Sequence, residues 1–273
     1  MSYESRGADA PGESRCRYGT SKVSVRGPER KLDVPYIAFL GGAETFGRFV
    51  RHPFVELIED GLGRPCVNLG SPNAGLDTFL NDPETLTIAR GADLCVVQVP
   101  PAHTLSNRFY RVHSRRNDRF LTASPAMASI FRNVDFTQFN FIRHMLGDLK
   151  AREPELFGMV LDELRQAWTA RMHVLLDLLP RPVRLLWLRQ SNTDGELPES
   201  ALGHEPLWVD RDMVMSLRGR IDGMDEIAVR TSRQTGEIAE MDYDPLKRPM
   251  VGHMLGPQMH RVIAKQMIAS LSE

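Results

Sequence analysis

Short apolar runs alternate with amphipathic segments along most of the chain, and this alternation restricts the fold more than any other feature. Five runs are predicted to be buried strands, at residues 36–42, 65–70, 93–99, 183–188 and 226–229. Helices are predicted between and after them, at residues 53–61, 82–90, 154–179, 211–217 and 257–271. Strands that alternate with helices in this way form a parallel sheet covered on both faces. We therefore expect a three-layer α/β fold with a doubly wound parallel sheet of about five strands.

One domain with a long insertion accounts for the length of 273 residues. Residues 1–30 are polar and are predicted to be an N-terminal extension, and residues 31–273 are predicted to form the domain. After the third strand, residues 100–153 are rich in Arg, Asn, Phe and Ser and include one predicted helix near 137–150. This region shows no strand pattern of its own, so we interpret it as an insertion and not as a second domain.

The charge balance and the cysteines limit the partners and the compartment of the chain. Lys and Arg total 34 against 35 for Asp and Glu, which argues against a nucleic-acid-binding domain because such domains are usually basic. No run approaches the roughly 18 apolar residues of a membrane-spanning helix, so no membrane partner is expected. The first residues lack the apolar core of a secretory signal, and the 3 scattered cysteines predict neither disulfides nor zinc. We expect a cytoplasmic protein.

Glycines, amides and histidines follow the predicted strands, where a doubly wound sheet binds its ligands. The residues of interest after the first three strands are Gly42, Glu44, Thr45, Gly70, Ser71, Asn73, His103 and Asn107. A polar loop at 190–199 follows the fourth strand. Because few of these side chains are solvating lysines, a common cleft is favoured over ordinary surface loops. The first loop lacks both GxGxxG spacing and a phosphate-binding lysine, and no metal-ligand spacing occurs, so no cofactor and no metal are expected.

Three blocks of sequence, in order and at strand ends, resemble the SGNH (GDSL-type) hydrolases. LGGAETFG at 40–47 resembles the first block, VNLGSPNAG at 67–75 the second, and HMLGPQMHRVIAKQM at 253–267 the last. The resemblance covers residues 36–99 and 181–273. It implies a flavodoxin-like strand order, an oxyanion-hole N–H at Gly70 and a catalytic histidine at His253.

The chain departs from the SGNH pattern at the reactive positions. Ala43 stands at the position of the nucleophilic serine, and Gly42 stands at the acid before it. Alanine has no nucleophilic oxygen, so the ordinary acyl-enzyme route cannot begin there. Met250 replaces the acid three residues before His253, and the Gly-x-Asn-Asp motif of the third block is missing.

A second resemblance covers nearly the full length of the chain. The stretches CRYGTSKVSVRGPE, YIAFLGGAETFG, NRFYRVHSRRNDRFL and VDFTQFNFIRHML are similar to an uncharacterised bacterial family, a domain of unknown function. This resemblance implies no established activity.

Two functional interpretations remain open. The first is a divergent SGNH-like hydrolase or acyl/group transferase that acts on a polar small molecule, an anionic substrate or a glycan. Its candidate residues are the bases Glu44 and His253, the hydroxyls Thr45 and Ser71, and the oxyanion donors Gly70, Asn73 and Asn107. The second is a non-catalytic protein that binds an anionic ligand in the same cleft. Either could be a homo-oligomer.

Basic side chains crowd into residues 108–119 and alternate with aromatic ones. Guanidinium groups bind phosphate, sulfate or carboxylate in a forked geometry. The cluster therefore predicts an anion site made by Arg108, Arg115, Arg116 and Arg119. The alternatives are a solvated surface loop, arginines paired with Asp118 and Asp135, and a site for single-stranded nucleic acid. The neutral total charge disfavours the nucleic acid.

Overall fold

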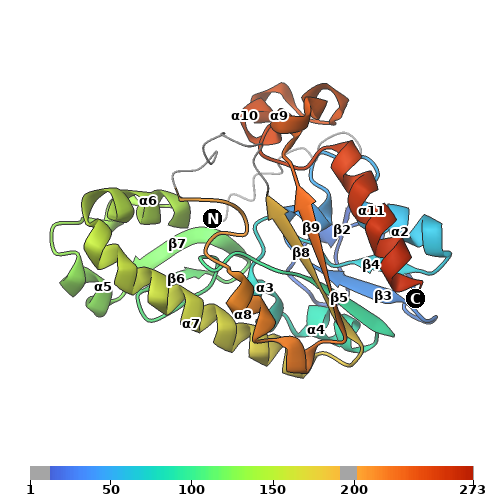
Figure 1. Ribbon diagram of the computed structural model, residues 1–273, viewed down its shortest axis with the longest axis horizontal. Helices are drawn as coiled ribbons and strands as arrows, with labels where there is room; N and C mark the ends of the chain where they lie inside the picture. The colour runs from blue at the N-terminus through green and yellow to red at the C-terminus, as the bar shows by residue number, and fades with distance from the viewer. Residues whose placement is uncertain (1–12, 191–201, 273) are drawn as a thin grey trace.

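A parallel sheet lies at the centre of the computed structural model, which describes residues 13–190 and 202–272 (Figure 1). Its strands are β3 (Ile37–Leu40), β4 (Cys66–Asn68), β5 (Leu94–Gln98), β8 (Val183–Gln190) and β9 (Gly223–Val229). They are hydrogen-bonded in the order β4-β3-β5-β8-β9, and each neighbouring pair is parallel. By position along the chain this order is 2-1-3-4-5, the flavodoxin-like order. The predicted α/β fold with a five-stranded sheet is confirmed.

Successive side chains of the central strands enter two separate cores, one on each face of the sheet. Ile37 and Phe39 of β3 belong to the core under α2 (Phe54–Leu62) and α11 (Pro257–Leu271). Ala38 and Leu40 of the same strand belong to the opposite core. Because both faces are buried, the strand is apolar throughout, as is typical of parallel sheets. In Figure 1, α2 and α11 lie on the right of the sheet, away from α7.

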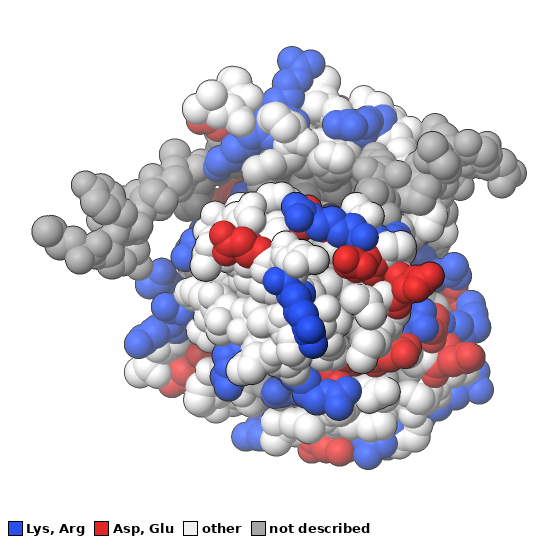
Figure 2. Space-filling view, turned by 90° about the vertical axis from the view of Figure 1, so that its left-hand side faces the viewer, with Lys and Arg blue, Asp and Glu red and all other residues white. Residues whose placement is uncertain are grey.

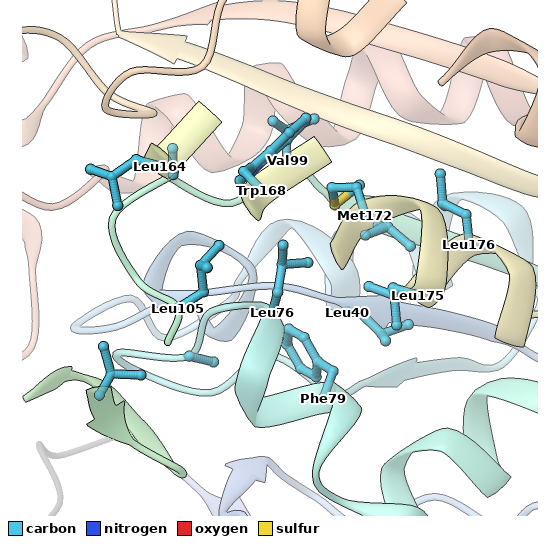
Figure 3. Packing of buried hydrophobic residues seen from close by; sticks show 14 of the residues in the cluster. Leu40, Leu76, Phe79, Val99, Leu105, Leu164, Trp168, Met172, Leu175 and Leu176 are labelled. Atoms are coloured by element: carbon cyan, nitrogen blue, oxygen red, sulfur yellow. The ribbon is translucent and has the colours of Figure 1, made fainter. Parts of the chain in front are cut away.

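Helix α7 (Pro154–Leu178) covers the second face together with the shorter helices α3 (Leu76–Leu80), α4 (Pro83–Arg90) and α8 (Arg211–Met215). Figure 3 shows Trp168 and Met172 of α7 in the same packed layer as Leu40 and Leu76. The Trp168 indole N–H also donates to the carbonyl of Pro100 at 2.8 Å. This hydrogen bond ties α7 to the loop that leaves the carboxyl end of β5.

The insertion after β5 contains strands, and the prediction that it has none is wrong. A hairpin is formed by β6 (Tyr110–His113) and β7 (Arg116–Ala123), followed by α5 (Pro125–Ile130), a 3-10 turn at Phe136–Gln138 and α6 (Ile142–Arg152). The sequence does not indicate the hairpin, because it is rich in arginine and buries only a few side chains, Tyr110, Val112, Asn117 and Phe120. Figure 1 shows the whole insertion to the left of the sheet.

The described part of the predicted polar extension packs against the domain. Two short strands, β1 (Arg15–Cys16) and β2 (Val25–Arg26), pair in antiparallel fashion. Tyr18 and Val23 between them are buried in the core. The Arg26 guanidinium donates to the carbonyls of Gly47 at 3.2 Å, Val50 at 3.0 Å and Arg51 at 2.8 Å. This segment therefore holds the chain that follows α1 (Ala43–Phe46).

A cap of short helical turns lies beyond the carboxyl ends of β8 and β9, at the top of Figure 1. It consists of α9 (Ser232–Thr235), turns at Glu237–Glu240 and Pro245–Lys247, and α10 (Arg248–Val251), none of which the sequence predicted. The N–H of Asp242 donates to the carbonyl of Phe49 at 2.9 Å, and Val251 packs with Phe49 and Val50. The cap therefore folds back onto the chain just after α1.

The polar loop predicted at 190–199 lies outside the described residues, apart from its first residue. Among the helices of the described chain, none is long and apolar enough to cross a membrane.

Candidate functional site

The strand order of the sheet reverses between β3 and β5, and this is the point where doubly wound sheets bind their ligands. Two polar side chains meet there. Glu44 lies in α1, directly after β3, and Gln98 is the last residue of β5. The Gln98 Nε2 donates a hydrogen bond of 2.9 Å to Glu44 Oε2. The fold thus places a partly exposed carboxylate, held by an amide, at the switch point.

The oxygen of the same amide organises the loop that carries Glu44. Gln98 Oε1 accepts from the N–H of Gly42 at 3.1 Å, from the N–H of Thr45 at 3.3 Å and from the Thr45 hydroxyl at 2.5 Å. A Cβ on Gly41 would lie 2.5 Å from Gln98 Oε1, so this close approach requires glycine. The sequence marks Gln98 as a polar residue at a strand end but does not reveal these contacts, because its partners lie more than 50 residues away.

A guanidinium from the insertion reaches the same edge of the sheet. Arg143 of α6 forms an ion pair with Glu205. The Gln190 N–H donates to the Glu205 carbonyl at 3.0 Å, so Glu205 is attached to the end of β8. Burial lowers the pKa of Arg143, while the negative charge of Glu44 acts in the opposite direction. Through Glu205, the Arg143 guanidinium is thus attached to the carboxyl end of β8.

His103, a predicted binding residue, is buried near Arg143. Its ring packs edge-on against Trp208, with the ring centroids 5.9 Å apart. Burial, and then the charge of Arg143, hold the pKa of His103 well below its ordinary value, so the ring is neutral. Its Nδ1 is buried and has no hydrogen-bond partner within the described chain.

Several of the predicted site groups are already occupied by internal hydrogen bonds. The Thr45 hydroxyl is bound to Gln98, and the residue is only 1% exposed, so it is not placed as a nucleophile. The Gly42 N–H is likewise bound to Gln98, and the Gly70 N–H donates to Asn68 Oδ1 at 2.9 Å. The expected oxyanion hole at Gly70 is therefore not offered to a substrate.

The predicted amide and hydroxyl residues in the loops after β4 and β5 differ in burial and in hydrogen bonding. Asn107 Oδ1 accepts from the N–H of Phe109 at 2.8 Å, and its Nδ2 donates to Leu105, so its amide stabilises its own turn. Ser71 is buried, and its N–H donates to the Gly41 carbonyl at 3.1 Å. Asn73 is exposed, in the left-handed conformation with a φ of 64°.

His253 lies in the turn between α10 and α11, and its side chain is exposed. Its N–H donates to the carbonyl of Met250 at 3.1 Å. The turn follows β9, which is three strands away from β3 in the sheet order. Val251 and Met254, on either side of His253 in the sequence, pack in the same cluster as Phe49.

The four arginines of the predicted anion site do not share a partner. Arg108 pairs with Glu163 of α7, with Nε and Oε2 2.5 Å apart. Arg119 lies over the ring of Phe141, 4.0 Å from its centroid. Arg115 and Arg116 are exposed near the hairpin turn. Figure 2, which faces the insertion, shows charges of both signs interspersed. Arg108 is thus paired, but with Glu163 and not with Asp118 or Asp135, the acids that the sequence suggested.

The described site contains a carboxylate, an amide and a guanidinium, while the hydroxyl of Thr45 is bound to Gln98. A partly exposed carboxylate can accept a proton, and a guanidinium can stabilise a negative oxygen. Within residues 13–190 and 202–272, no group of three or more His, Cys, Asp or Glu is placed to hold a metal ion.

The solved structures that resemble this chain over most of its length include the following three. A lipase, Lip_vut3, from a goat rumen metagenome is 13% identical, with a TM-score of 0.41 and coverage of 87% of this chain and 97% of its own. A protein from Lactobacillus plantarum is 11% identical, with a TM-score of 0.37 and coverages of 87% and 96%. A carbohydrate esterase family 2 enzyme with a carbohydrate-binding domain, from Corynascus thermopiles (Myceliophthora fergusii), is 11% identical, with a TM-score of 0.43 and coverages of 90% and 68%.

No curated protein matches the sequence. One family model matches residues 1–273, and its description is a domain of unknown function. The chain therefore belongs to the family DUF6473.

Proposed function

We propose that this protein is a divergent SGNH-like hydrolase or group transferase that acts on a hydroxyl-rich substrate, such as a carbohydrate ester, without a covalent intermediate. The observation that carries the proposal is the hydrogen bond of 2.9 Å between Gln98 and Glu44 at the switch point of the sheet. This hydrogen bond holds the Glu44 carboxylate at the edge of the sheet where doubly wound folds bind their ligands. The resemblance of the sequence blocks to SGNH hydrolases supports the same reaction class.

In the proposed reaction Glu44 is the general base. It takes a proton from water or from a substrate hydroxyl, and that oxygen forms a bond to the carbonyl carbon of the ester. Arg143 stabilises the negative carbonyl oxygen. The ester C–O bond then breaks, and the leaving alkoxide receives the proton from Glu44. This route needs neither a serine at Ala43 nor the hydroxyl of Thr45.

The charges at this edge favour a neutral polar substrate over an anion. Glu44 and Glu205 contribute two negative charges there, and Arg143, already paired with Glu205, contributes one positive charge. An anionic substrate would meet net repulsion from these three groups. A carbohydrate has hydroxyls that both donate and accept, which suits carboxylates as well as a guanidinium.

Turnover of aryl acetates and acetylated sugars tests the role of Glu44. The Glu44→Gln variant keeps the shape of the side chain but removes the base, and we expect kcat to fall about 100-fold or more. Glu155→Gln, an exposed change on α7, is the matched control and should leave kcat unchanged. Equal activity in the wild type and in Glu44→Gln would contradict the assignment.

A second candidate function is a non-catalytic binding protein. It is favoured by a specific observation, namely that Ala43 replaces the nucleophile while the N–H groups of Gly42 and Gly70 are bound internally. Under either candidate function, a fluorophosphonate should leave the protein unlabelled. The two candidates differ in turnover, because a binding protein would show a ligand-dependent rise in Tm with no hydrolysis of any acetylated sugar.

A further inference from the structure

An open pocket lies between the N-terminal segment, the start of α4 and the turn of the hairpin β6–β7. Its volume is about 370 Å³, which is within the range of pockets that hold small molecules. Side chains of both charges line it, with Lys22 and Arg115 as the cations and Asp82 and Glu84 as the carboxylates. Segments that are far apart in the sequence therefore bring opposite charges to one pocket.

Hydroxyl groups hold the two carboxylates in place. The Thr20 hydroxyl donates to Glu84 Oε1 at 2.8 Å. The Ser21 hydroxyl donates to Asp82 Oδ2 at 2.6 Å, and the Thr85 hydroxyl donates to the same oxygen at 2.5 Å. Within the described residues, the second oxygen of each carboxylate has no hydrogen-bond partner. Asp82 is only 8% exposed, so its charge is costly to leave without a partner.

The chain around the two cations fixes where they stand. Lys22 precedes Val23, whose side chain is buried in the core. Arg115 lies at the turn of the hairpin. Near that turn, Asn117 Oδ1 accepts from the Thr78 hydroxyl at 2.9 Å, and Thr78 itself lines the pocket. The pocket is therefore bounded by segments that are attached to the rest of the domain.

Charges of opposite sign share this pocket without pairing with one another. Neither Lys22 nor Arg115 has an ion-pair partner in the described part of the chain, and the same is true of Asp82 and Glu84. The nitrogens of the cations therefore lie more than 4.0 Å from the carboxylate oxygens. A ligand with a single charge would be attracted by one pair of side chains and repelled by the other. A ligand that carries both charges would be attracted by all of them.

We propose that this pocket is a second binding site, separate from the reaction site at Glu44, and that its ligand is a small zwitterion such as a free amino acid. The carboxylate of the ligand accepts from the Lys22 ammonium and the Arg115 guanidinium. The ammonium of the ligand donates to the unused oxygens of Asp82 and Glu84. This inference does not rest on the proposed function, because none of these pocket residues takes part in the ester reaction.

Saturation-transfer NMR with matched probes tests the ligand class. L-Alanine, L-serine and L-glutamine carry both charges, whereas propionate lacks the ammonium of alanine and ethylamine lacks its carboxylate. We expect at least one amino acid to bind about tenfold or more tightly than propionate, ethylamine and inorganic phosphate, because each single-charge probe loses one set of charged hydrogen bonds.

Three outcomes with these probes would overturn the proposal. Propionate or phosphate that binds as tightly as the amino acids would indicate an anion site, such as the sequence predicted for Arg115. Ethylamine that binds as tightly would indicate a cation site at the two carboxylates. The third outcome is that none of the amino acids binds.

Variants of the pocket test where the amino acid binds. Arg115→Gln and Glu84→Gln each remove one charge, and the glutamine at position 84 keeps an acceptor for the Thr20 hydroxyl. We expect each variant to weaken binding about tenfold or more. Arg116→Gln, next to Arg115 but outside the pocket, and Glu155→Gln on α7 are exposed matched controls and should bind like the wild type. Binding that is unchanged in either pocket variant would overturn the proposal.

Further measurements separate lost contacts from lost structure and from the proposed function. The Tm of each unliganded variant shows whether it is folded, and Lys22→Gln, at an exposed position, is a further variant in case Glu84→Gln does not fold. The Glu44→Gln variant should bind the amino acid like the wild type. A failure of the proposed function therefore leaves this test intact.

Discussion

His260 of α11 accepts the backbone N–H of Phe54, the first residue of α2, at its Nδ1 with a distance of 3.0 Å. The two rings also stack, with centroids 5.7 Å apart. The residue before Phe54 is Pro53, which has no side-chain acceptor to cap the helix. His260 therefore supplies that cap from a helix more than 200 residues further along the chain.

This contact predicts a pH-dependent loss of stability. Burial lowers the pKa of His260 to about 3, compared with an ordinary value of 6.5. Between these values the unfolded state binds the proton and the folded state does not, so stability falls as the pH decreases through this window. The contribution from this group is up to about 1.4 kcal/mol per pH unit. Urea unfolding at several pH values between about 7 and 4 measures it.

Two variants separate this effect from the titration of carboxylates. His260→Gln cannot take up a proton, and its stability should depend less steeply on pH than that of the wild type. His52→Gln, at an exposed position, should show the slope of the wild type. Identical slopes for His260→Gln and the wild type would contradict the prediction.

Gln98 should be important for both stability and the proposed activity. Replacement by Leu leaves the N–H groups of Gly42 and Thr45 and the Thr45 hydroxyl without their shared acceptor. Each unsatisfied buried group costs about 1–3 kcal/mol, so we expect Gln98→Leu to lower the free energy of unfolding by about 3 kcal/mol. Gln98→Glu keeps an acceptor but places a second carboxylate beside Glu44.

Gln98→Glu should therefore affect activity more than stability. Two adjacent carboxylates raise the pKa of one of them, so the pH optimum of any turnover should shift upward. Denaturant unfolding and a pH–rate profile measure the two effects separately. A Gln98→Leu variant with the stability of the wild type would show that the amide network contributes little.

The central sheet could be predicted because each of its strands carries its own local signal. The runs that became β3, β5 and β8 are apolar on both faces, and helices of suitable length separate them. The hairpin β6–β7 lacks such a signal, since Arg111, Arg116 and Arg119 interrupt its apolar positions. What makes it a hairpin is largely the burial of Tyr110 and Phe120 against the rest of the domain, a tertiary effect that local sequence does not carry.

The position of Glu44 after a buried strand could be predicted from the sequence. Whether the polar groups around it are free to bind a substrate could not. A polar residue just after a buried strand is visible in sequence. Whether the N–H of Gly70 is free depends on Asn68, and whether the Thr45 hydroxyl is free depends on Gln98. The position of Arg143 near the end of β8 could not be predicted either, because Arg143 comes from the insertion. Hydrogen bonds between distant segments decide these points.

Asn117 is expected to be a structural link between the hairpin and the sheet. It is fully buried, and its Oδ1 accepts from the N–H of Gly75 at 2.8 Å and from the N–H and hydroxyl of Thr78 at 3.1 Å and 2.9 Å. Its Nδ2 donates to the carbonyl of His113 at 2.9 Å. We expect Asn117→Leu to cost about 2–4 kcal/mol, because several buried polar groups lose their partner.

Asn117→Leu should lower the stability of the hairpin region locally, as well as the stability of the whole protein. Hydrogen exchange of the amides of Gly75 and Thr78 should accelerate in Asn117→Leu, and limited proteolysis should cut the hairpin more readily. Asn133→Leu, an exposed position in the same insertion, is the matched control. Unchanged exchange at Gly75 and Thr78 would contradict the role of Asn117.

Two glycine-to-alanine changes should have opposite effects on stability. A Cβ on Gly70 would lie 2.4 Å from the backbone nitrogen of Phe46 and 2.8 Å from Asn68 Oδ1, which cannot both move aside. Overpacking of this kind costs about 1–3 kcal/mol. A Cβ on Gly147, inside α6, meets nothing within 4 Å, and alanine favours the helix by about 0.5–1 kcal/mol. Gly70→Ala should therefore lower the urea midpoint and Gly147→Ala should raise it. If Gly70→Ala proved as stable as the wild type, the close packing of the loops after β3 and β4 would not be as the structure describes it.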